Sequence, residues 1–310
     1  MKIYKPKFWD NKIGLYSIFL LPLSLIINFF IFIKKKITDV LIFNIPIICV
    51  GNIYIGGTGK TPTVILLHKL LSDLNKKPVI IRKKYKNHSD EYNLIKNYSK
   101  DLIINFERDQ AIYEAINKGY KTIILDDGYQ DYKINKDINI LCFNQKQLIG
   151  NGLVIPAGPL RENLNSIKSA DIIIINGKKD KIFEKKVYSK NKDILICYSK
   201  YQIANKKLFK NKKVIALAGI GNPKNFFDLL RENHFNIKKE LSFPDHYEFK
   251  KSELTNIIKY AKKNKCRILM TEKDYLRIKK FKLKYIDYLK VNLEIKQKNK
   301  LLEKILKIYD

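Results

Sequence analysis

The sequence predicts an α/β fold: a doubly wound parallel sheet, with an N-terminal hydrophobic helix before it and a second, smaller α/β domain after it. Three observations predict this arrangement. Short apolar runs rich in β-branched residues alternate with stretches of helical periodicity, which is typical of parallel strands joined by crossover helices. A run of 21 residues without a charge, 13–33, precedes the first strand. The order strand, turn, helix begins again after residue 213.

The N-terminal apolar run is long enough for a helix of about 30 Å, close to the thickness of a hydrocarbon core. Three interpretations stay open: a membrane span, an interfacial or partly inserted anchor, and a core helix of a soluble domain. An interfacial anchor uses the flanking lysines, such as those at 34–36, on anionic headgroups. It also tolerates the residues that weaken a span, which are Ser17, Pro22, Ser24 and Asn28. A signal peptide is disfavoured, because the run is too long and no small-residue cleavage site follows it.

The sheet expected behind this helix consists of apolar runs separated by helical or turn segments. We expect strands at 45–52, 77–82, 100–106, 120–128, 138–144 and 170–176. A polar, lysine-rich stretch then indicates a connector to the second domain. The predicted organisation is a membrane-associating helix at 1–36, a sheet domain at 37–200, a linker at 201–213 and a C-terminal α/β domain at 214–310.

The formal net charge of +31 indicates either attraction to a polyanion or a general drift of composition towards lysine. Only six of the 61 basic residues are arginine. Nucleic-acid readers depend on arginine for bidentate base contacts, and the chain has no zinc-finger or RNP-like pattern, so no nucleic-acid partner is expected. The four cysteines lie far apart without a CxxC pair, which predicts buried free thiols in a reducing compartment.

The glycine-rich turn after the first strand carries the strongest chemical signal. Glycines let backbone N–H groups turn towards phosphate, a lysine reaches the outer phosphates, and a hydroxyl binds Mg²⁺. The stretch YIGGTGKT therefore predicts a P-loop that binds a nucleotide and Mg²⁺, formed by Tyr54, Ile55, Gly56, Gly57, Thr58, Gly59, Lys60 and Thr61. Tyr54 stands where the usual pattern has glycine. The competing interpretation is a glycine-rich turn with a surface lysine.

Two adjacent carboxylates, Asp126 and Asp127, end the apolar strand KTIILDD. Because the carboxyl ends of parallel strands meet at one edge of a sheet, we expect them beside the P-loop, where an aspartate can hold Mg²⁺. Adjacent side chains of a strand point to opposite sides, which predicts different roles for the two. A solvated strand end is the competing interpretation.

Two further groups are candidates for proton transfer. Asp90 follows the second strand, where its carboxylate could take a proton from a hydroxyl nucleophile. Ser89, Asp90 and Glu91 are equally good residues to begin a helix. The segment FPDHYEF contains Asp245 and His246. A lone histidine is more often structural, but this pair could orient or tune a catalytic carboxylate.

Six segments together resemble the tetraacyldisaccharide 4′-kinases, the lipid A kinases of Gram-negative bacteria. In chain order they are VGNIYIGGTGKTP, SDE, DDGYQ, PAGPLRE, FPDHYEF and TEKD. The resemblance spans nearly the whole chain and implies a P-loop kinase at the cytoplasmic face of the inner (plasma) membrane. Its implied reaction moves the γ-phosphate of ATP to the 4′-hydroxyl of a tetraacylated glucosamine disaccharide 1-phosphate, a membrane lipid, and yields lipid IVA. The alternative is a membrane-associated P-loop NTPase switch that binds a protein partner.

The resemblance also implies roles for individual residues. Lys60 and Thr61 would hold the β- and γ-phosphates and Mg²⁺. Asp90 would be the catalytic base, and His246 would be its partner across a domain cleft. The residues near the metal would be Thr61, Asp126, Asp127 and Glu162. Arg161 and Gln130 would line the same site.

The sequence departs from the family pattern at three places. The segment PAGPLREN lacks the second proline that is often found. Asp131 stands where the family commonly has a histidine after the two aspartates, and residues 83–86 lack the glycines of the usual loop. All three changes suit a lysine-rich lineage, and those at 131 and 83–86 leave the role of their position open.

Overall fold

The computed structural model describes residues 6–85 and 89–310. Contacts divide these residues into two compact units. The large unit contains 6–84, 101–200 and 294–310, and the small unit contains 85, 89–100 and 201–293. The last position of the departure at 83–86 lies outside the described residues.

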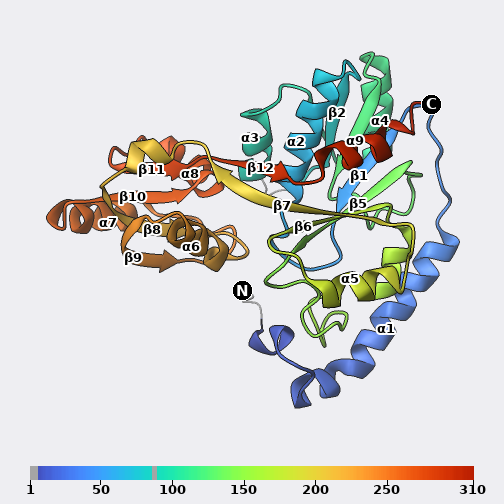
Figure 1. Cartoon of the computed structure of the whole chain (residues 1–310), viewed down its shortest axis with the longest axis horizontal. Helices are drawn as coiled ribbons and strands as arrows, with labels where there is room; N and C mark the ends of the chain where they lie inside the picture. Colours follow the sequence, from blue (N-terminus) through green and yellow to red (C-terminus); the bar gives the residue numbers. More distant parts are fainter. Residues whose placement is uncertain (1–5, 86–88) are drawn as a thin grey trace. The chain divides into compact units, whose positions relative to one another are not determined.

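An eight-stranded sheet forms the centre of the large unit (Figure 1). Its strands are β1 (Ile47–Gly51), β2 (Pro78–Lys83), β3 (Leu102–Asn105), β4 (Thr122–Asp126), β5 (Ile138–Asn144), β6 (Ile172–Asn176), β7 (Leu195–Ile203) and β12 (Val291–Ile295). Their order is β12-β7-β6-β5-β1-β4-β2-β3. β1 pairs in parallel with β4 on one side and with β5 on the other. The strand order reverses beside β1, and open α/β sheets bind ligands at such a point.

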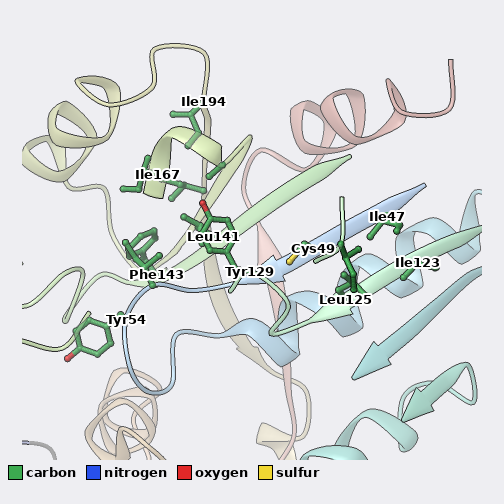
Figure 2. Packing of buried hydrophobic residues seen from close by; sticks show 14 of the residues in the cluster. Ile47, Cys49, Tyr54, Ile123, Leu125, Tyr129, Leu141, Phe143, Ile167 and Ile194 are labelled. Atoms are coloured by element: carbon green, nitrogen blue, oxygen red, sulfur yellow. The ribbon is translucent and has the colours of Figure 1, made fainter. Parts of the chain in front are cut away.

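Helices cover both faces of this sheet. They are α2 (Lys60–Asp73), α4 (Arg108–Asn117), α5 (Lys181–Tyr188) and α9 (Lys298–Leu306), with a short 3₁₀ helix η2 (Leu164–Ser169). α4 and α5 contribute to one hydrophobic core with strand residues that include Ile47, Cys49, Ile123, Leu125, Leu141 and Phe143 (Figure 2). On the other face, Thr63 of α2 contacts Cys142, which alternates with those core residues along β5. All four cysteines are buried and free, as predicted.

One polar stripe joins the N-terminal helix α1 (Leu15–Ile37) to the rest of the large unit. It consists of Ser17, Ser24, Asn28 and Lys35. Spacings of seven, four and seven residues place these side chains on one helix face. Ser24 Oγ donates to the carbonyl of Val154 at 2.8 Å, and Ser17 Oγ accepts from the Asn151 amide at 3.1 Å. Before α1, the 3₁₀ helix η1 (Lys7–Asp10) is attached in the same way, because Trp9 donates to the carbonyl of Pro156.

The remaining faces of α1 expose large apolar side chains, among them Leu15, Tyr16, Phe19, Leu23, Ile26 and Phe30. The helix is long and apolar enough to cross a membrane, and only 11% of its apolar window is buried. That exposure does not fit a core helix of a soluble domain, which buries its apolar face.

The small unit is built on a four-stranded sheet in the order β11-β10-β8-β9. The strands are β8 (Lys213–Ala218), β9 (Asn236–Ser242), β10 (Cys266–Thr271) and β11 (Ile286–Leu289), and all of their pairings are parallel. The helices are α3 (Ser89–Lys96), α6 (Pro223–Glu232), α7 (Lys251–Lys263) and α8 (Glu272–Ile278), with 3₁₀ helices η3 (Lys206–Phe209) and η4 (Lys279–Phe281). Separate hydrophobic clusters pack around Ile215 and Val214, which are neighbours on β8 and point to opposite faces.

The predicted fold class is confirmed, with three differences in its organisation. Residues 294–310, expected in the C-terminal α/β domain, belong to the large unit and contain α9. The segment with Asp90 forms α3, which packs against α8 and belongs to the small unit. Residues 201–213, expected as a linker, contain the end of β7, the helix η3 and the first residue of β8. The domain boundaries themselves stay a prediction.

Candidate active site

The P-loop occupies the turn between β1 and α2. Gly56 and Gly59 have φ of +115° and +95°, a conformation that side-chain-bearing residues rarely adopt, and Gly59 is the N-cap of α2. The amide of Asn52 crosses the loop and donates to Thr58 Oγ1 at 3.0 Å and to the carbonyl of Gly56 at 3.4 Å. Asn52 is fully buried. It therefore fixes the loop from inside, and the sequence analysis missed this role.

The first two positions of the predicted P-loop are tied to the protein interior. The ring of Tyr54 is fully buried, and its hydroxyl donates to Asp10 Oδ1 at 3.0 Å. The backbone N–H of Ile55 donates to the carbonyl of Pro159 at 2.9 Å. At these two positions the loop is anchored to η1 and to the segment before Leu160. Phosphate contacts are thus left to the stretch from Gly56 to Thr61.

Asp126 ends β4 and forms a buried ion pair. In the sheet it is the register partner of Val50 on β1 and of Arg82 on β2. The Arg82 guanidinium contacts Asp126 Oδ2, and both side chains are buried. Asp126 Oδ1 is buried too and has no hydrogen-bond partner among the described residues. A buried carboxylate oxygen without a donor is an acceptor that suits a cation or water.

Asp127 follows directly and faces the P-loop lysine. Its Oδ1 lies 2.9 Å from Arg161 Nη1 and 3.7 Å from Lys60 Nζ. Burial by itself would raise the pKa of Asp127, but Lys60, Arg161 and Arg82 outweigh burial and hold that pKa well below its usual range. Burial lowers the pKa of Lys60, and Asp127 opposes this change. The two side chains therefore stabilise each other's charged form.

The turn at Asp127 is held by an arginine from α4. Asp127 has φ of +56°, a left-handed conformation. Arg108 Nη2 donates to the carbonyl of Asp127 at 2.7 Å, and Arg108 Nη1 lies 3.0 Å from Asp131 Oδ2. Asp131, which departs from the family pattern, thus pairs with the arginine that supports the aspartate turn.

Glu162 is the third carboxylate of the site and is only 3% exposed. Its Oε1 accepts from the Gln130 amide at 3.0 Å, and its Oε2 lies 2.9 Å from Lys35 Nζ of α1. The Gln130 amide also donates to the carbonyl of Asn52 at 3.0 Å. We use the term P-loop cluster for Lys60, Asp126, Asp127, Gln130, Arg161 and Glu162.

The P-loop cluster offers only some of the ligands that Mg²⁺ requires. Among the described residues, no group of three His, Cys, Asp or Glu side chains could hold a metal ion by itself. Mg²⁺ is usually bound through one or two carboxylates together with water and substrate phosphates. The open Oδ1 of Asp126 fits such a carboxylate, whereas the oxygens of Glu162 are already engaged by Lys35 and Gln130.

A second charged cluster lies in the small unit and contains Asp90, His246, Lys273 and Arg277. Asp90 lies in the first turn of α3 and is 3% exposed. Its Oδ2 accepts hydrogen bonds from Arg277 Nη2 at 2.6 Å and from Arg277 Nε at 2.9 Å. The same oxygen lies 3.7 Å from Lys273 Nζ and 3.5 Å from His246 Nδ1. We name this group the Asp90 cluster. Asp90 therefore lies in the first turn of a helix and also meets His246, so a helix start in this segment and a contact with His246 are compatible.

The TEKD segment and the helix that it begins, α8, supply Lys273 and Arg277 to the Asp90 cluster. Thr271 caps α8 by accepting from the N–H of Asp274. Lys273 Nζ also lies 2.8 Å from Glu91 Oε1. Asp274 is fully buried, accepts from the N–H of Gly219 at 3.0 Å and pairs with Arg277 at 2.7 Å. The segment is thus a scaffold that points Lys273 and Arg277 at Asp90.

This environment keeps Asp90 ionised. Burial by itself would raise its pKa, but His246, Lys273 and Arg277 lower the pKa far below the usual aspartate range. A carboxylate with such a pKa is charged at every physiological pH. It is a good hydrogen-bond acceptor for a hydroxyl and a weak base.

Replacing Arg277 is expected to change the pH profile if Asp90 acts in its ionised form. In Arg277→Gln the pKa of Asp90 rises, because one of the groups that lower it is removed. If kcat/KM requires ionised Asp90, the acid limb of kcat/KM should lie at higher pH in the variant than in the wild type. The measurement is kcat/KM between pH 5 and 8. Arg277→Lys should stay close to the wild type, and an unchanged profile in Arg277→Gln would contradict the role of this pair.

Sequence reasoning missed the partners of the acidic residues, although a signal was present. Four of the six arginines pair with the aspartates discussed above: Arg82 with Asp126, Arg108 with Asp131, Arg161 with Asp127, and Arg277 with Asp90. In a chain that uses lysine almost everywhere, an arginine marks a position where a planar, multidentate donor is needed.

Comparisons with known proteins point to one family. Residues 16–310 match the family model LpxK, tetraacyldisaccharide-1-P 4′-kinase. The chain is 40% identical over 312 residues to a tetraacyldisaccharide 4′-kinase of Pelagibacter ubique, with 99% of each chain covered. It is 32% identical over 323 residues to one of Rickettsia bellii, again with 99% of each covered.

The fold is also shared with a solved structure. The crystal structure of the "apo" form LpxK from Aquifex aeolicus in complex with ATP superimposes with a TM-score of 0.73 at 24% identity. The match covers 96% of this chain and all of that one. The resemblance inferred from six short motifs is confirmed. The chain belongs to the tetraacyldisaccharide-1-P 4′-kinase family.

Proposed function

We propose that this protein transfers the γ-phosphate of ATP to the 4′-hydroxyl of a tetraacylated glucosamine disaccharide 1-phosphate, at the cytoplasmic face of the inner membrane. Family membership over almost the whole chain supports the reaction. The observation that carries the proposal is the P-loop cluster, in which Lys60 and Arg161 converge on Asp127 at the carboxyl end of β4.

The P-loop cluster is assigned to the nucleotide. Lys60 neutralises the outer phosphates of ATP, and N–H groups of the loop from Gly56 to Thr61 face its phosphate oxygens. Mg²⁺, when bound, would be held by Thr61 and Asp126, with Asp127 close by, and would offset the charge that develops on the phosphates. Arg161 then keeps Asp127 oriented beside Lys60. For Glu162, contact with the metal would be indirect.

The Asp90 cluster is assigned to the acceptor hydroxyl. Arg277, Lys273 and His246 all approach the Oδ2 atom of Asp90. We assign its Oδ1 atom to the hydrogen bond from the 4′-hydroxyl. Phosphoryl transfer passes through a loose transition state with little need for a strong base, so orientation of the hydroxyl matters more than early removal of its proton. Asp90 takes the proton late, and His246 can pass it on.

The way α1 is attached supports interfacial binding over a membrane span. The polar stripe of α1 extends from Ser17 to Lys35, about 27 Å along the helix axis. Contacts of Ser17, Ser24 and Lys35 hold that whole length against the large unit. A helix attached in this way cannot cross a bilayer without leaving the unit, but it can place its apolar outer face among the lipids.

An anchor of this kind is needed because the acyl chains of the acceptor stay in the bilayer. Removing an acyl chain from a bilayer costs about 0.8 kcal/mol per CH₂, which is prohibitive for four chains. The enzyme must therefore reach the sugar at headgroup level. Lys34, in the last turn of α1, adds attraction to anionic lipid.

Acidic residues on the exposed face of α1 are expected to release the protein from membranes. In the double variant Phe19→Asp, Leu23→Asp, each lost apolar side chain weakens binding by about 2 kcal/mol, so vesicle affinity should fall about a thousandfold. ATP affinity should not change. The measurement is co-sedimentation with anionic vesicles. Ile182→Asp, an exposed apolar position on α5, is the control and should bind vesicles like the parent. Equal binding by the double variant would refute the anchor.

The proposed function is tested by coupling ATP consumption to the acceptor. Purified protein is incubated with ATP, with and without the monophosphorylated disaccharide lipid in mixed micelles. We expect ADP to form only with the acceptor, in equal amount to phosphorylated lipid. ADP formation that is indifferent to the lipid would instead favour a membrane-associated NTPase switch.

A further inference from the structure

The last turn of α1 places a lysine on a buried carboxylate of the P-loop cluster. Lys35 Nζ lies 2.9 Å from Glu162 Oε2, although the lysine side chain is 37% exposed and the glutamate only 3%. The same ammonium lies 4.8 Å from the ring centroid of Tyr132. A surface lysine gains little from an exposed ion pair, but here it neutralises an anion that is cut off from water.

Glu162 connects this lysine to the nucleotide side of the cluster. Gln130 donates to Glu162 Oε1, and its own Oε1 accepts from Arg161 at 3.4 Å. Arg161 Nη1 in turn lies 2.9 Å from Asp127, which faces Lys60. Polar contacts therefore run without a break from the end of α1 to the P-loop lysine.

We propose that Lys35 is a positioning residue for phosphoryl transfer. The P-loop cluster is then ordered only while α1 is docked on the rest of the large unit. This inference rests on the proposed function. Without Lys35 the buried Glu162 needs another cation, and Arg161 is the one that shares Gln130 with it. Movement of Arg161 towards Glu162 removes it from Asp127 and disorders the group beside Lys60.

The test compares Lys35→Gln with Lys36→Gln. Both variants remove one positive charge from the last turn of α1, but the Lys36 ammonium lies over the ring of Phe32, at 5.7 Å. Activity is measured with the lipid acceptor in neutral detergent micelles, where electrostatic attraction to anionic lipid plays no part. We expect kcat of Lys35→Gln to fall about tenfold, the low end for loss of an outer partner of a site residue. Lys36→Gln should keep the wild-type kcat.

Two further variants separate positioning from a structural role. Lys35→Arg keeps the cation and should recover most of the lost kcat. In a Glu162→Gln background, Lys35→Gln should have no further effect, because the pair is already broken. Equal kcat for Lys35→Gln and Lys36→Gln, failure of Lys35→Arg to recover activity, or multiplying effects of Lys35→Gln and Glu162→Gln would each overturn the inference. Absence of activity in the wild type would instead reject the proposed function.

Discussion

Asp90→Asn is expected to lower kcat by about 100-fold or more while leaving the Kd of ATP nearly unchanged. Asparagine keeps the shape of the side chain but removes the charge that Arg277, Lys273 and His246 surround. Its amide can no longer accept the proton of the acceptor hydroxyl. Because Asp90 acts on the acceptor, nucleotide binding should survive. The measurements are steady-state kinetics with the lipid acceptor and a fluorescent-nucleotide titration.

A matched control for this variant is Asp228→Asn. Asp228 lies in the same unit and pairs with Arg231, away from the Asp90 cluster. Its kcat should stay near the wild-type value. Melting curves of both variants show whether loss of the charge partner unfolds the small unit. If Asp90→Asn lost kcat and ATP affinity together while remaining folded, Asp90 would not be the group that handles the hydroxyl.

Lys60→Ala is expected to lower kcat/KM for ATP by about 10²–10³-fold. The lysine ammonium is the cation of the P-loop, and its charge is stabilised by Asp127 at 3.7 Å. Loss of this charge weakens binding of the outer phosphates and removes stabilisation of the transferring group, so both KM and kcat should change. Kinetics at several ATP concentrations separate the two effects.

Lys69→Ala is the control for the P-loop lysine. Lys69 lies on the exposed side of the same helix, α2, and its loss removes an equal charge. It should leave both constants unaltered. A Lys60→Ala enzyme as active as its parent would remove the P-loop from the mechanism.

The sequence was sufficient to predict that Lys60, Asp126 and Asp127 lie together, because parallel topology brings strand ends to one edge of the sheet. A glycine-rich turn after one strand and two aspartates ending another must share an edge if the strands run in parallel. The structure bears this out, with Lys60 facing Asp127. The pairing of Arg82 with Asp126 could not be derived, because it depends on β4 lying between β1 and β2.

The Asp90 cluster could be predicted only in part. The family resemblance predicted that His246 meets Asp90 across a domain cleft. The two side chains do meet, but both lie in the small unit, so the cleft was wrong. Arg277, the closest partner of Asp90, lies 187 residues away in sequence, and no periodicity links positions so far apart. The same applies to Lys35 and Glu162, which are 127 residues apart. Such contacts arise from the docking of whole elements, so local pattern cannot reveal them.

The central claim is that this protein places a phosphate on the sugar of a membrane lipid. Its most direct test is the identity of the product formed from ATP labelled with ¹⁸O in the γ-phosphate and the monophosphorylated tetraacyl disaccharide. We predict a lipid that carries one additional labelled phosphate, with its phosphorus coupled to the proton at C4′ in a ³¹P–¹H correlation spectrum. Phosphate attached at another position, or ATP bound with no label reaching the lipid, would contradict the account.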